Sequence, residues 1–172
     1  DGTNVLDTSG NGRDGEILGA TVVAGRVGQA LEFDGASGGV TIEGLALRGK
    51  QHSISLWIKR NKAGVRRVIF INGLFQVGFS DSELFVHTGR IGRADVNRPL
   101  AKVDVPLGKW AYLVVTWDTA AASDNVKVYV DGLLRIKATL ANAKSRDLTI
   151  DTMRIGHTGD PGSLDQTFSG AV

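Results

Sequence analysis

Residues 52–60 read His-Ser-Ile-Ser-Leu-Trp-Ile-Lys-Arg, and this stretch decides the fold class. Its aliphatic side chains, Ile54, Leu56 and Ile58, recur at every second position. A period of two places them on one face of a β-strand, whereas an amphipathic helix would need a period of 3.6. The stretch therefore predicts a strand with one buried face and one solvent-facing side.

The same alternation continues along the chain. Residues 126–130 (Val-Lys-Val-Tyr-Val) repeat it, and residues 110–117 are apolar on both faces, as expected for a central strand. The pairs Asp131-Gly132 and Asn72-Gly73 lie between apolar runs and predict hairpins, because a type I′ turn needs positive φ at both central residues. Further short strands are expected at residues 30–34, 40–43, 68–71, 74–79 and 84–87.

Composition narrows the class of protein. The chain has 172 residues, with 23 glycines, 3 prolines and no cysteine, which excludes disulfides and thiolate metal sites. Its length suits one domain, and about ten to twelve short strands separated by Gly, Asn and Asp turns are typical of an all-β sandwich or barrel. We expect a single domain over residues 1–172. No apolar run reaches the roughly 18 residues that a membrane helix needs, so no membrane insertion is expected.

Charge is unevenly distributed although the net charge is only +2. Residues 1–44 carry a net charge of −5, residues 45–110 carry +8 and residues 111–172 carry −1. The sequence contains no ribonucleoprotein motif, zinc finger or basic helix, so a nucleic-acid partner is not expected.

The basic middle of the chain contains two candidate anion-binding segments. Arg66 and Arg67 flank one predicted hairpin, and Arg90 and Arg93 lie in the next glycine-containing loop. If the two segments meet at one rim, their guanidinium groups could bind sulfate or carboxylate groups of acidic polysaccharides in bidentate fashion. The alternative is ordinary solvated loop charge.

Two aromatic residues are candidates for stacking on sugars. Trp57 and Tyr129 lie opposite the aliphatic rows of their strands and are therefore expected on the outer face. Trp110 and Trp117 are predicted to be core residues. The alternative for each candidate ring is packing in the core.

Five segments, taken in order, carry a family resemblance: residues 7–15, 25–35, 53–59, 108–118 and 128–132. They resemble the bacterial laminin G-like jelly-roll domains, which are related to concanavalin A-like lectins and glucanases. The resemblance implies two stacked antiparallel sheets and a secreted or cell-surface module that binds glycans or proteins. It also implies a structural calcium ion in many members, and catalysis in a minority, as glycoside hydrolases or polysaccharide lyases.

Calcium would be held by the first glycine-rich loop. Asp7, Asn11 and Asp14 could supply some of the six to eight oxygen ligands that calcium takes, and Asp34 is a further candidate. The alternative is a metal-free loop of Asx turns.

An enzyme is not expected. The jelly-roll glucanases use a Glu-x-Asp-x-x-Glu motif, and here Glu32 and Asp34 are followed by Ser37 where the second Glu should stand. The three histidines form no HxH or HExxH pair, and no Gly-x-Ser-x-Gly turn occurs.

Both ends of the chain depart from the resemblance. Only Asp1–Leu6 precede the first turn, and residues 168–172 end where family members continue with an acidic strand. We therefore expect a segment of a longer protein.

The sequence thus predicts a non-catalytic extracellular recognition module that binds glycans, acidic ones included, with a structural calcium ion. The alternative is a structural or adhesive module with a protein partner. A glycoside hydrolase or lyase is the least favoured reading.

Overall fold

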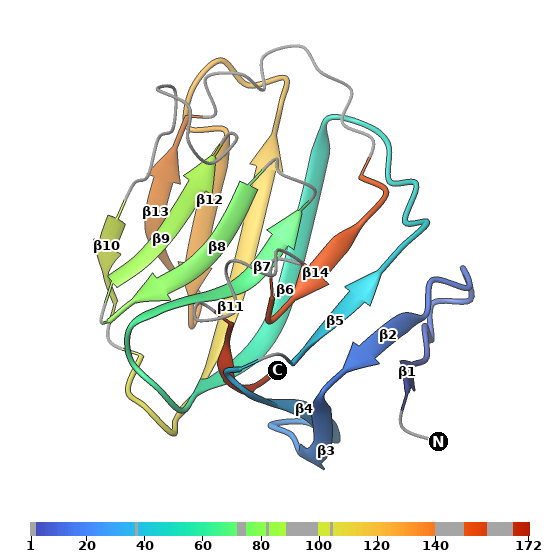
Figure 1. The fold of residues 1–172 in the computed structure, drawn as a ribbon. Coiled ribbons are helices and arrows are strands. Elements are labelled where there is room, and N and C mark those ends of the chain that lie inside the picture. Colours follow the sequence, from blue (N-terminus) through green and yellow to red (C-terminus); the bar gives the residue numbers. More distant parts are fainter. Residues whose placement is uncertain are drawn as a thin grey trace.

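The computed structural model describes residues 3–36, 38–71, 75–81, 83–88, 100–103, 105–139, 150–157 and 167–172. Within these residues the chain forms two antiparallel sheets packed into a sandwich and contains no helix (Figure 1). The prediction of an all-β jelly-roll sandwich is confirmed. In the same ranges there is no helix that could span a membrane.

Within the described residues, the first sheet has eight strands in the order β1-β2-β5-β14-β7-β8-β9-β10. In that order, the strands span Asn4–Val5, Gly15–Leu18, Gly39–Ile42, Met153–Ile155, Val65–Ile71, Phe75–Ser80, Glu83–Thr88 and Leu100–Lys102. The second sheet, over the same part of the chain, has seven strands in the order β13-β12-β11-β6-β15-β4-β3. In that order, these strands span Leu133–Ala138, Val126–Val130, Trp110–Asp118, Gln51–Arg60, Ser169–Ala171, Gln29–Asp34 and Ala20–Ala24.

The two long strands β6 and β11 form the centre of the seven-stranded sheet. They pair in antiparallel register from Trp110 opposite Lys59 to Asp118 opposite Gln51. On the inner face of this pair, Ile58 and Leu113 are fully buried. The aliphatic row that predicted β6 thus lies against the core.

One prediction about β11 is wrong. Trp117 is buried, as expected, but Trp110 lies on the outer face and is half-buried. The two residues are seven positions apart, an odd number, so a strand of period two must place them on opposite faces. Trp110 therefore belongs to the outer surface of the seven-stranded sheet.

The β12–β13 hairpin turns at Asp131-Gly132, as predicted. Both residues have positive φ, 50° and 78°, as a type I′ turn requires. The carboxylate of Asp131 also accepts a hydrogen bond of 2.8 Å from the backbone N–H of Tyr112, which fixes the turn to β11. The second predicted turn, Asn72-Gly73, lies outside the described residues.

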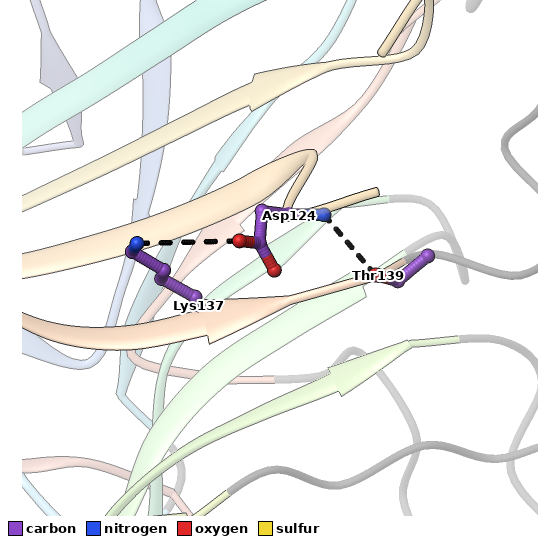
Figure 2. A network of polar contacts seen from close by, with 3 residues as sticks. All are labelled: Asp124, Lys137 and Thr139. Carbon is purple, nitrogen blue, oxygen red and sulfur yellow. Dashed lines mark hydrogen bonds and ion pairs between the residues drawn. The ribbon is translucent and has the colours of Figure 1, made fainter. Parts of the chain in front are cut away.

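Surface polar contacts hold the other end of this hairpin (Figure 2). The Asp124 N–H donates to the hydroxyl of Thr139 at 3.1 Å, and the Asp124 carboxylate lies 4.0 Å from the Lys137 ammonium. Both charged side chains are more than half exposed, so the ion pair contributes little stability, about 0–1 kcal/mol.

Candidate functional site

Aromatic side chains gather on the outer face of the seven-stranded sheet. Trp57 on β6 lies directly opposite Tyr112 on β11, and their ring centroids are 5.0 Å apart with planes tilted by 42°. The guanidinium carbon of Arg26, from the β3–β4 turn, lies 5.5 Å from the centre of the Trp57 ring. The three side chains form a connected cluster that solvent reaches from one side.

Two further aromatics extend this cluster along the same face. The Lys59 ammonium lies 5.3 Å from the centre of the Trp110 ring. Tyr129 on β12 pairs with Val114, so it is a diagonal neighbour of Tyr112 across the ladder. We call Trp57, Trp110, Tyr112 and Tyr129 the aromatic face; all four are half-buried.

The aromatic face combines the two properties that a sugar-binding surface needs. Flat rings offer an apolar platform for the C–H faces of a pyranose or furanose, because the face of an aromatic ring is apolar and carries a partial negative charge. Arg26 and Lys59 place donors beside those rings for hydroxyl, carboxylate or sulfate groups. The sequence prediction that Trp57 and Tyr129 lie outward thus agrees with their positions in the sheet.

The predicted arginines lie elsewhere. Arg66 and Arg67 are on β7 of the eight-stranded sheet, so the structure does not bring them together with Trp57 or Tyr129. Arg67 is only 8% exposed, and its Nε donates to the side-chain oxygen of Gln76. Arg66 is half-buried.

Arg90 and Arg93 lie outside the described residues. Whether their loop meets the rim formed by the first basic segment stays a prediction.

The loop of residues 7–14 is organised around the Asp7 carboxylate. One carboxylate oxygen accepts the Ser9 N–H at 2.8 Å and the other accepts the Arg13 N–H at 3.0 Å. The Asp7 N–H donates to the Asp14 carboxylate at 2.7 Å, and the Asn11 side-chain amide donates to the Ser9 hydroxyl at 2.8 Å. These contacts match the Asx-turn alternative.

Calcium would fit this loop only in part. Asp7 and Asp14 lie together and would be its carboxylate ligands, with the side-chain oxygen of Asn11 as a further donor. Asp34 is on β4 in the other sheet, where its carboxylate accepts the Ala36 N–H at 2.7 Å. Across the described ranges, no three Asp, Glu or His side chains form a group that could hold a metal.

The hydrogen bonds of Asp7 predict a pH-dependent contribution to stability. The Ser9 side chain, and then the backbone N–H groups of Arg13 and Ser9, lower the pKa of Asp7 from 3.8 to about 2. A carboxyl group with a depressed folded-state pKa stabilises the fold above its unfolded pKa, and this stability is lost as the pH falls from about 4 towards 2.

Asp7→Asn should therefore lower the free energy of unfolding at neutral pH, because the amide replaces one of the two acceptor oxygens with a donor. The difference from wild type should shrink as the pH falls from 4 towards 2. Urea unfolding at a series of pH values measures it, and a difference that does not change with pH would contradict this role for the carboxylate.

Glu32 and Asp34, the two carboxylates considered above as a catalytic pair, both form local hydrogen bonds. Glu32 and Asp34 both lie on β4, two residues apart. The Glu32 carboxylate accepts from the Asn61 side chain at 3.0 Å, and Asp34 closes the turn at Ala36. Each carboxylate thus helps to hold a neighbouring segment in place.

A cavity of about 670 Å³ opens between β2 and β5 of one sheet and β4 of the other. Its walls include aliphatic residues such as Ile17, Leu31 and Ile42. The polar residues of its lining are Asn4, Asp7, Thr8, Arg13 and Gln29. The aromatic residue in its lining, Phe33, is only 1% exposed and offers no open face for stacking, so the aromatic face is the better candidate for a sugar.

Comparisons with known proteins agree with this architecture. A family model described as the concanavalin A-like lectin/glucanases superfamily, of laminin G type, matches residues 34–172. A search of curated proteins found no match.

Several solved structures share the fold at low sequence identity. Domain 4 of AbnA, a GH43 extracellular arabinanase from Geobacillus stearothermophilus solved with arabinotriose, has a TM-score of 0.71 and 20% identity over 98% of this chain and 83% of that one. The botulinum neurotoxin serotype D ligand-binding domain, in complex with N-acetylneuraminic acid, has a TM-score of 0.67 and 14% identity over 96% of this chain. The binding domain of botulinum neurotoxin DC, in complex with rat synaptotagmin II, has a TM-score of 0.63 and 17% identity over 90% of this chain.

This chain spans 44% and 41% of the two neurotoxin chains, and at these identities the likeness concerns the fold. The family model covers most of the chain, and the two stacked antiparallel sheets agree with it. The chain therefore belongs to the laminin G-type family of the concanavalin A-like lectin/glucanases superfamily.

Proposed function

We propose that this chain is a non-catalytic glycan-binding module and that the aromatic face is its binding surface. The observation that carries the proposal is the contact of Trp57 with both Tyr112 and Arg26 on the outer face of the seven-stranded sheet. A sugar ring can stack on the indole while the guanidinium donates to its hydroxyl or acidic groups. The glycan ligands of the similar arabinanase domain and serotype D neurotoxin domain support this class of ligand.

Three features of the proposal concern catalysis, location and calcium. Glu32 and Asp34 are engaged in local hydrogen bonds, which supports a binding role over hydrolysis. The extracellular arabinanase relative supports a secreted or cell-surface location. A structural calcium ion at Asp7 and Asp14 would stabilise the loop through mass action.

A protein partner is the second candidate, and one observation favours it. Leu133 and Leu134 on the edge strand β13 are 58% and 42% exposed, and Leu134 pairs with Tyr129. An exposed apolar pair beside an aromatic residue suits a protein interface. The neurotoxin DC domain in complex with synaptotagmin II supports this class of partner.

A glycan array run with calcium and again with a chelator tests the proposal. The array should carry arabino-oligosaccharides, sialylated glycans and sulfated or uronic acid-containing glycans. Wild type should bind a defined set, and Trp57→Ala should bind it at least about tenfold more weakly, because a central aromatic anchor is worth about 2 kcal/mol or more. Binding that survives the chelator would remove calcium from the proposal and leave the glycan.

Phe70→Ala is the matched control. Phe70 is a half-buried ring on the eight-stranded sheet, with the Arg154 guanidinium 5.9 Å from its centre, so it reproduces the ring-and-cation pair away from the aromatic face. It should bind glycans like wild type. A blank array from folded wild-type protein would exclude the glycan and favour the protein partner.

A further inference from the structure

A second cavity lies at the end of the sandwich where β10 of one sheet contacts β13 of the other. It has a volume of about 710 Å³. Val103, Val105 and Leu107 give it an apolar wall, and three cationic residues line it as well: Arg60, Lys102 and Arg135. The aromatic face lies on the outer surface of the seven-stranded sheet, whereas Arg60 lies between the two sheets. This cavity is therefore separate from the aromatic face.

Arg60 is a buried cation at the end of β6. Its side chain is 2% exposed, because it follows the inward row of Ile54, Leu56 and Ile58. The guanidinium carbon lies 4.3 Å from the centre of the Phe79 ring. Its two terminal nitrogens donate to the carbonyl oxygens of Val105 and Asp81, whereas Nε is buried without a hydrogen-bond partner.

No carboxylate in the described part of the chain forms an ion pair with Arg60. Asp81 contacts it through its backbone carbonyl, whereas the Asp81 carboxylate accepts the Gly64 N–H at 3.0 Å and acts on Arg60 as a nearby negative charge. A buried charge is costly, and here carbonyl dipoles, a ring and the nearby Asp81 charge supply partial compensation. Positive potential therefore remains at the wall of the cavity.

Lys102 and Arg135 add exposed donors to this potential from two different sheets. Glu83 lies opposite Lys102 in the β9–β10 ladder and offsets part of its charge. The cations at the cavity are thus Arg60, Lys102 and Arg135, and the nearby carboxylates are those of Asp81 and Glu83. The balance remains positive, and the exposed guanidinium of Arg135 can offer two parallel N–H groups to one anion.

We propose that this cavity is an anion-binding site that accepts a sulfate or carboxylate group. Arg135 and Lys102 are the direct donors, and Arg60 is a fixed buried charge that strengthens their attraction. The apolar wall formed by Val103, Val105 and Leu107 would lie against the carbon skeleton that carries the anionic group.

Titration with sodium sulfate against sodium chloride at equal ionic strength tests the site. Backbone amide NMR signals of Val103, Val105 and Arg135 should shift with sulfate and saturate at millimolar concentration. Arg135→Ala should weaken the apparent affinity roughly tenfold, equivalent to about 1.4 kcal/mol, because it removes charge-assisted hydrogen bonds to the anion.

Lys137→Ala is the matched control, since it removes one positive charge from the same strand, where Lys137 contacts Asp124 (Figure 2). It should bind sulfate like wild type. Equal weakening by the Arg135 and Lys137 variants, or shifts that chloride reproduces, would overturn the site in favour of non-specific charge.

Trp57→Ala separates this site from the proposed function, because it alters the aromatic face and leaves the cavity intact. It should retain wild-type sulfate affinity. Loss of sulfate affinity in this variant would overturn the assignment of the anion to the cavity. Sulfate binding with a blank glycan array would overturn only the proposed function.

Discussion

Phe168→Ala is expected to lower the free energy of unfolding by about 3–5 kcal/mol. The Phe168 ring is fully buried and packs edge-to-face on Phe33, with ring centroids 6.5 Å apart and planes at 69°. Its backbone N–H also donates to the Gly156 carbonyl at 2.7 Å, so the residue cannot shift easily to fill a cavity. A loss of this size is a large part of the 5–15 kcal/mol that stabilises a typical domain.

Urea unfolding followed by tryptophan fluorescence measures this loss. Phe70→Ala is again the control, since it deletes the same atoms from a half-buried ring outside the core. It should cost clearly less. Equal costs for the two variants would mean that the Phe33–Phe168 contact is not central to the core.

Gly170→Ala is the second large effect, and we expect it to cost about 3 kcal/mol or more through backbone strain and overpacking. Gly170 has a φ of 144°, a conformation that residues with a side chain rarely adopt. A Cβ atom at this position would lie 1.9 Å from the Lys59 carbonyl oxygen and 3.1 Å from Arg60 Cα. These are backbone atoms of the neighbouring strand, so β15 would have to move away from β6.

Gly132→Ala separates the two causes. Gly132 also has a positive φ, 78°, but a Cβ atom there would meet nothing within 4 Å. It should therefore show the conformational cost alone, about 1 kcal/mol. Thermal unfolding of the two variants makes the comparison, and a Gly170 variant no less stable than the Gly132 variant would contradict the close approach of β15 to β6.

Sequence patterns predicted the central strands because those have a strong local signal, whereas the short strands β1, β2, β3, β10, β14 and β15 were not predicted. The alternation of Ile54, Leu56 and Ile58 and of Val126, Val128 and Val130 has a period of two, and the Asp131-Gly132 turn has the backbone it requires. These signals depend only on neighbours within a few residues. They place Trp57 and Tyr129 on an outer face without knowledge of the tertiary structure.

The composition of the aromatic face could not be predicted in full, because it depends on strand order. β6 and β11 are neighbours although about 50 residues separate them in sequence. The odd spacing of Trp110 and Trp117 could have shown that one of them faces outward. Arg26 gave no such signal, since only the fold brings its turn to Trp57.

The positions of the charged side chains, buried or exposed, were the hardest property to predict from the sequence. Arg66 and Arg67 are neighbours in one basic segment, yet Arg67 is buried while Arg66 is half-buried. The phase of each strand and the bulge between Arg67 and Ile69 decide which side chain enters the interior. A cluster of cations in sequence therefore did not predict a cluster on the surface.

The most direct test of the account is an NMR titration of the three tryptophan indole N–H signals with a glycan that binds on the array. Trp57 and Trp110 belong to the aromatic face, whereas Trp117 is buried on the inner face and serves as an internal reference. The account predicts that the Trp57 and Trp110 signals shift and saturate together while the Trp117 signal stays in place. Saturating binding that leaves the Trp57 and Trp110 signals unmoved would contradict the assignment of the binding surface.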